Sequence, residues 1–193
     1  MNYDDIRKFD IGSKYYAPFP GQTKIKTYIP LLGELIDSVE QYTSSKKLPK
    51  VIYNIELKTG ATYDDVYNSK PDEMVDAVMT VVDSKKIGDR FYIQSFDMRP
   101  LQYAREKYPK VTLGFLTASP ASFDDNIKQL GFVPHIYSPN QKLVTPELVQ
   151  QCKTGKTKLI VWTVNTNEDM RKLKSMGVDG IITDYPNYLS ELE

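Results

Sequence analysis

The sequence has 193 residues, 40% of them hydrophobic, and its 25 basic and 25 acidic side chains give a formal net charge of zero. This length and composition predict a single domain, residues 1–193, with one substantial core. A balanced charge without a basic stripe argues against a nucleic-acid partner. The single cysteine, Cys152, excludes an internal disulfide and a cysteine-based zinc site. No apolar run approaches the ~20 residues that cross a bilayer, so we expect a soluble chain without a transmembrane segment.

The elements predicted along the chain change character at residue 51. Before it, the sequence predicts a short helix at 3–9, an irregular segment at 11–30 and a helix at 31–45. After it, apolar strand-like runs alternate with amphipathic helices. The six predicted strands are 51–58, 91–96, 111–116, 133–138, 158–164 and 179–183. The predicted helices between them are 71–88, 98–108, 122–131, 145–155 and 166–177.

This alternation predicts an α/β fold with a parallel sheet, either an open doubly wound sheet or a (β/α)8 barrel of the TIM type. The segment after the first strand, ELKTGATYDD, has no G-x-G-x-x-G fingerprint, which favours the barrel over a dinucleotide-binding sheet. A helix leads into the first strand as if it ended a unit whose own strand is missing. We therefore expect an incomplete barrel with about six of eight parallel strands.

The first strand, VIYNIELK, ends with a carboxylate and an amine on one face, because Glu56 and Lys58 are two residues apart. Neither side chain belongs in a dry core unless it is paired or binds something. An ordinary salt bridge at a strand end is one interpretation. A ligand site is the other.

The segments NIELK, QSF, WTVN and GVDGIITDYP, taken in order, resemble the glycerophosphodiester phosphodiesterase family of (β/α)8 barrels. The resemblance covers essentially the whole chain. It implies metal-dependent hydrolysis of glycerophosphodiesters, which are deacylated phospholipids, to glycerol 3-phosphate and an alcohol. Glu56 would bind a divalent cation, Mg²⁺ or Ca²⁺, and Lys58 would lie by the substrate phosphate. Trp162 would shape the glycerol site, and we predict that Gln94, near a strand end, contacts the substrate.

The sequence also departs from the family. The family's acid–base histidines lie in H-R-G and H-D motifs that this chain lacks, and its only histidine, His135, matches neither. A typical barrel of about 250 residues exceeds this chain by roughly two βα units. We therefore expect an N-terminally truncated barrel with no catalytic residue of its own, inactive by itself.

Two other functions stay open. One is a non-catalytic barrel remnant or ligand-binding protein, and the other is an unrelated open α/β sheet that binds a small ligand. In-frame H-R-G and H-D motifs upstream of Met1 would favour the enzyme. The sequence predicts neither the compartment, since family members work inside and outside the cytoplasm, nor the oligomeric state.

Overall fold

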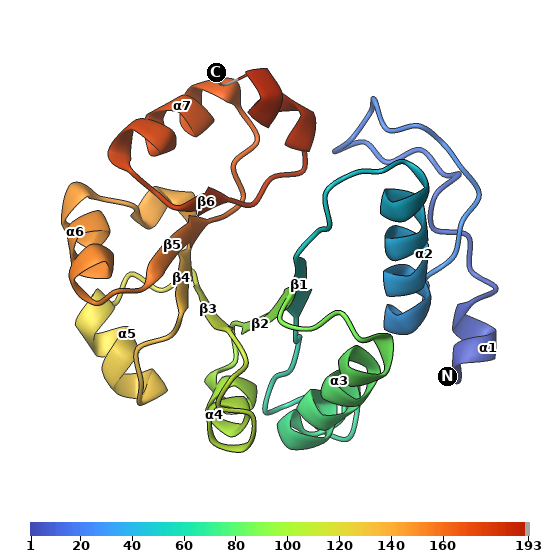
Figure 1. Ribbon diagram of the computed structural model, residues 1–193, viewed down its shortest axis with the longest axis horizontal. Helices are drawn as coiled ribbons and strands as arrows, with labels where there is room; N and C mark the ends of the chain where they lie inside the picture. Colours follow the sequence, from blue (N-terminus) through green and yellow to red (C-terminus); the bar gives the residue numbers. More distant parts are fainter. Residues whose placement is uncertain (192–193) are drawn as a thin grey trace. The chain divides into compact units, whose positions relative to one another are not determined.

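A computed structural model describes residues 1–191 (Figure 1). The chain forms two compact units, one of residues 1–50 with 80–86, the other of residues 51–79 with the chain from 87 onward. No helix among the described residues is long and apolar enough to cross a membrane.

The first unit contains α1 (Tyr3–Ile6), α2 (Leu32–Ser45) and the last turns of α3 (Pro71–Lys85). The Glu34 carboxylate joins α1 to α2, because it accepts hydrogen bonds from the Tyr3 hydroxyl and the Leu31 amide at 3.0 and 3.2 Å. Lys85 joins α3 to α2 by an ion pair with Asp37 at 2.5 Å. The segment between α1 and α2 is irregular, as predicted.

The second unit contains six parallel strands in chain order, hydrogen-bonded from β1 to β6 without a crossover. The strands are β1 (Tyr53–Glu56), β2 (Phe91–Ser95), β3 (Leu113–Thr117), β4 (Ile136–Pro139), β5 (Lys158–Val161) and β6 (Gly180–Ile181). The helices that follow β2 to β5 are α4 (Met98–Lys107), α5 (Phe123–Leu130), α6 (Pro146–Thr154) and α7 (Asn167–Met176). Two short 3₁₀ helices are η1 (Gln141–Leu143) and η2 (Pro186–Glu191).

The sheet curls, and α4 to α7 lie along its convex side (Figure 1). This arrangement confirms the predicted incomplete TIM-type barrel, because a doubly wound sheet would carry helices on both faces. The core lies between the convex face and the helices, where strand residues such as Ile93 and Leu159 and helix residues such as Leu101 and Met170 are buried. Each such side chain contributes about 1.5–3 kcal/mol to folding.

Side-chain caps fix where these helices start, and hence the loops at the carboxyl ends of the strands. Asp97, Ser122, Thr145 and Thr166 each accept a hydrogen bond from a backbone amide in the first turn of α4, α5, α6 and α7. Such a cap contributes about 1 kcal/mol. In barrels of this kind the loops that follow the strands carry the functional site.

Candidate functional site

Glu56 and Lys58 lie at the carboxyl end of β1, with Lys58 Nζ 4.0 Å from Glu56 Oε1. The two side chains are 30% and 81% exposed, respectively. A pair this long and this exposed contributes only about 0–1 kcal/mol. The predicted salt bridge is therefore present but weak, and the Lys58 ammonium is accessible to an anionic ligand.

Gln94 is the register partner of Glu56 on the neighbouring strand β2, so both side chains lie on one face of the sheet. Gln94 is only 5% exposed, and its Oε1 atom has no hydrogen-bond partner in the described part of the chain. An unpaired buried amide oxygen costs about 1–3 kcal/mol. On the next strand, β3, the register partner of Gln94 is Gly114, which makes room for it, since a Cβ there would lie 3.2 Å from the Gln94 Cβ.

Two aromatic rings meet over the concave face of the sheet. Phe96 follows β2 and Trp162 follows β5, and their ring centroids are 5.2 Å apart in an edge-to-face pair. Because β3 and β4 lie between them, a flat sheet would separate their backbones by about 14 Å. The rings meet because the sheet curls. The Trp162 indole is held by its Nε1, which donates to the Ser138 carbonyl at 2.8 Å.

Phe96 is a site residue that the sequence analysis did not single out. It belongs to the QSF segment and lies two residues after Gln94, hence on the same face. It is 47% exposed although it is a large apolar side chain. Strand periodicity alone could have placed Phe96 beside Gln94, but its contact with Trp162 depends on the curvature.

The loops after β1 and β2 are tied together by Arg99. Its guanidinium contacts Asp64 at 2.5 Å and Asp97 at 2.6 Å, and Thr59 donates to Asp97 at 2.8 Å. Burial alone would raise the pKa of the Asp97 carboxyl, but the hydrogen bonds from Arg99 and Thr59 outweigh burial and hold this pKa below its ordinary value. Thr59 follows Lys58 directly, so this network orders the loop that carries Lys58.

His135 lies at the amino end of its strand, because it directly precedes β4. Glu56 lies at the carboxyl end of β1, so the two residues are at opposite ends of the strands. Its Nδ1 accepts a hydrogen bond from the Leu113 amide at 3.1 Å, so the neutral ring carries its proton on Nε2. Burial, with a smaller effect of Arg105, lowers the pKa of the imidazole. These contacts give His135 a structural role.

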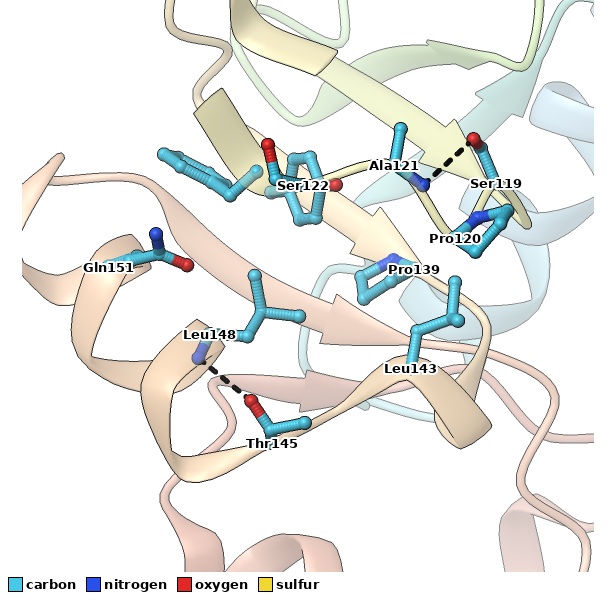
Figure 2. A pocket seen from close by; sticks show the side chains of 11 residues that line it. Ser119, Pro120, Ala121, Ser122, Pro139, Leu143, Thr145, Leu148 and Gln151 are labelled. Carbon is cyan, nitrogen blue, oxygen red and sulfur yellow. Dashed lines mark hydrogen bonds between the residues drawn. The ribbon is translucent and has the colours of Figure 1, made fainter. Parts of the chain in front are cut away.

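A recess lies between the loops after β3 and β4 on the helix side, away from Glu56 and Lys58 (Figure 2). No charged side chain lines it. Its hydroxyls serve local turns, since Ser119 Oγ accepts from the Ala121 amide and Thr145 Oγ1 from the Leu148 amide, both at 3.2 Å. It therefore offers no cationic side chain to pair with a phosphate.

The described residues do not make a divalent-cation site by themselves. Among them, no group of three or more His, Cys, Asp or Glu side chains is placed to hold a metal ion. Asp64 and Asp97 are engaged by Arg99, whereas Glu56 is paired only loosely with Lys58, at 4.0 Å. Mg²⁺ and Ca²⁺ each take six or more oxygen ligands, counting water.

A parallel sheet curled toward a barrel, with polar and aromatic side chains at the carboxyl ends of its strands, defines a (β/α)-barrel of the enzyme type. Residues 1–188 match the model of the Glycerophosphoryl diester phosphodiesterase family, and the chain belongs to this family of phosphoric diester hydrolases.

Named relatives agree with this assignment. A glycerophosphodiester phosphodiesterase of Caldanaerobacter subterraneus subsp. tengcongensis is 28% identical over 193 residues, which cover 98% of this chain and 70% of the relative. One from Bacillus altitudinis is 26% identical, covering 96% of this chain and 69% of the relative. The chain thus spans about 70% of the length of these two relatives.

Solved structures share the fold. A Silicibacter pomeroyi protein assigned as a glycerophosphoryl diester phosphodiesterase superposes with a TM-score of 0.83 at 30% identity, over all of this chain and 67% of the other. An Oleispira antarctica phosphodiesterase, in complex with the product sn-glycerol-3-phosphate, gives a TM-score of 0.75 at 21% identity, over all of this chain and 70% of the other.

Proposed function

We propose that these residues form the substrate-binding part of a metal-dependent enzyme that hydrolyses glycerophosphodiesters to sn-glycerol 3-phosphate and an alcohol. The observation that carries the proposal is the buried Oε1 of Gln94, which has no hydrogen-bond partner among the described residues. Gln94 is the register partner of Glu56, and Lys58 is exposed just past the carboxyl end of the same strand. The family and the sn-glycerol-3-phosphate bound to the Oleispira antarctica phosphodiesterase support the same ligand class.

Each side chain has a role that its chemistry fits. The Lys58 ammonium pairs with the phosphodiester and offsets the extra negative charge of the five-coordinate transition state. Gln94 Oε1 is an acceptor, so it takes a hydrogen bond from a hydroxyl of the glycerol. Trp162 and Phe96 form an apolar wall against the carbon atoms of the glycerol.

Glu56 is proposed as one ligand of the divalent cation, Mg²⁺ or Ca²⁺. When bound, the cation neutralises phosphate charge. Because the described residues supply too few ligands, and the family's H-R-G and H-D histidines are absent from the 193 residues, turnover needs groups outside this sequence. The chain alone is then expected to bind sn-glycerol 3-phosphate without hydrolysing diesters.

Binding can be measured through Trp162, which is the only tryptophan and lies at the site. Titration with sn-glycerol 3-phosphate should change its fluorescence. Lys58→Ala should weaken binding by about tenfold or more, since a hydrogen bond to a charged group contributes about 1.5–3 kcal/mol. Lys8→Ala is the matched control, because Lys8 is also exposed and paired with a carboxylate, Asp5. Equal effects of the two substitutions would refute the phosphate site.

Activity is measured as release of sn-glycerol 3-phosphate from glycerophosphocholine with Mg²⁺ or Ca²⁺. Turnover by the 193-residue chain that is abolished by Glu56→Ala would refute the need for outside groups. A chain extended by a segment that carries the two histidine motifs should be active. Binding without turnover in that extended chain would favour the non-catalytic alternative.

A further inference from the structure

The loop between β1 and α3 presents two tyrosines to solvent. Tyr63 is 54% exposed and Tyr67 is 84% exposed, and their rings form an edge-to-face pair with centroids 5.8 Å apart and planes at 71°. Two rings at this angle make a corner with two aromatic walls. The negative faces of such rings attract cations.

The aromatic corner, Tyr63 with Tyr67, is built on an ordered turn. The Tyr63 carbonyl accepts hydrogen bonds from the amides of Val66, Tyr67 and Asn68 at 3.0, 2.8 and 3.2 Å. Asn68 Nδ2 donates to Asp64 at 3.0 Å. These bonds order the backbone that carries both rings before any ligand arrives, which lowers the entropic cost of binding.

The corner lies close to Lys58. A Cβ on Gly60 would lie 3.1 Å from the Tyr63 ring, so this ring rests against Gly60, two residues after Lys58. Consecutive Cα atoms are about 3.8 Å apart, so the backbone of Gly60 is within about 8 Å of that of Lys58. The Arg99–Asp64 ion pair fastens the same loop to the one after β2.

The charges around the corner also suit a cation. Arg99 neutralises Asp64, whereas Asp65 is 61% exposed and forms a long ion pair with Lys70, at 3.6 Å. Lys70 is itself 55% exposed, and such an open ion pair is weak, so a ligand cation can displace it. An aromatic corner beside a carboxylate is a setting that recognises quaternary ammonium groups.

We infer that Tyr63 and Tyr67 form a subsite for a quaternary ammonium alcohol, so that the preferred diester carries choline. This inference rests on the proposed function, because it takes Lys58 to hold the phosphate to which that alcohol is joined. It gives the loop between β1 and α3 a role in specificity.

The test uses NMR titration of the 193-residue chain with choline chloride at constant ionic strength. Its neutral isostere, 3,3-dimethylbutan-1-ol, is titrated in parallel. Choline should shift the Tyr63 and Tyr67 ring signals and bind about two- to fivefold more tightly than the neutral alcohol, as expected for an exposed cation–π contact. Tyr63→Leu and Tyr67→Leu should abolish this preference. Tyr42→Leu is the control, because Tyr42 is 59% exposed on α2.

Equal binding of the two alcohols would overturn the inference and leave an apolar patch, and absence of choline binding would also overturn it. Because Tyr67 is largely exposed, its replacement should leave the amide spectrum unchanged, which excludes loss of folding as the cause. The proposed function is read separately from sn-glycerol 3-phosphate binding at Trp162. That binding should survive Tyr67→Leu, so failure of the phosphate site and failure of the choline subsite give different results.

Discussion

Replacing Gln94 by methionine should stabilise the protein while weakening ligand binding. The side chain is 5% exposed, and its buried Oε1 atom has no hydrogen-bond partner among the residues that the structure describes, which costs about 1–3 kcal/mol. Methionine has a similar length and no unpaired oxygen, so Gln94→Met should gain about 1 kcal/mol. For a chain of this size the gain corresponds to a rise in Tm of about 2–4 °C.

Gln141→Met is the control, because the Gln141 side chain makes a hydrogen bond that methionine cannot make, from its Nε2 to the Thr163 carbonyl at 2.6 Å. This control should lose about 0.5–1.5 kcal/mol. Denaturant titrations of both variants give the midpoints, and Trp162 fluorescence gives their affinity for sn-glycerol 3-phosphate. Gln94→Met should bind it about two- to tenfold more weakly, the worth of one hydrogen bond. If Gln94→Met destabilised the protein as much as the control does, the amide oxygen would have a partner in solution and our reasoning would fail.

Three further results are expected. His135→Leu should lower the free energy of unfolding by about 1–3 kcal/mol in denaturant titrations, because it leaves the Leu113 amide without an acceptor. His135→Asn should restore part of this loss, and neither substitution should change the binding of sn-glycerol 3-phosphate. Burial, with a contribution from Asp179, raises the pKa of Cys152 to about 12, so mass spectrometry should find iodoacetamide labelling at about pH 8 only after denaturation. The pKa of Asp76 is lowered, mainly by a hydrogen bond from Lys107. The ionised carboxylate therefore stabilises the fold above its ordinary pKa of 3.8, and this stabilisation is lost as the pH falls through the lower pKa of the folded state. Asp76→Asn should accordingly make the acid-unfolding curve less steep.

The element pattern could be predicted from the sequence because each strand is a short apolar run and each helix has a periodic apolar face. The ends of the elements depended on local backbone chemistry. The helix predicted to Gly88 ends at Lys85, because Lys86 and Gly88 take left-handed φ values of 52° and 66°. The strand predicted from 133 begins at Ile136, after Pro134, which has no amide hydrogen to donate to a ladder.

The candidate site could be predicted only in part. Glu56, Lys58 and Gln94 follow from strand periodicity and the family motif. The structure places Glu56 at the end of β1, Lys58 two residues after it, and Gln94 on β2 as the register partner of Glu56. The contact between Phe96 and Trp162 depends on how far the sheet curls, which the spacing of residues along the chain does not encode.

A buried polar atom without a hydrogen-bond partner indicates a ligand site only where the residues around it also suit a ligand. Within residues 1–191, Thr157 Oγ1 is buried without a hydrogen-bond partner, as Gln94 Oε1 is. Thr157, however, directly precedes β5 and so lies at the amino end of that strand. Gln94 differs because a carboxylate is its register partner and an exposed Phe96 follows it on the same face. A buried polar atom without a partner and an exposed large apolar ring therefore occur side by side. Such departures from the usual pattern of burial and hydrogen bonding are expected at functional sites. Under the proposed function, the free energy lost at Gln94 is stability given up for recognition of a hydroxyl. The stability and the binding of Gln94→Met test both parts of this proposal in one variant.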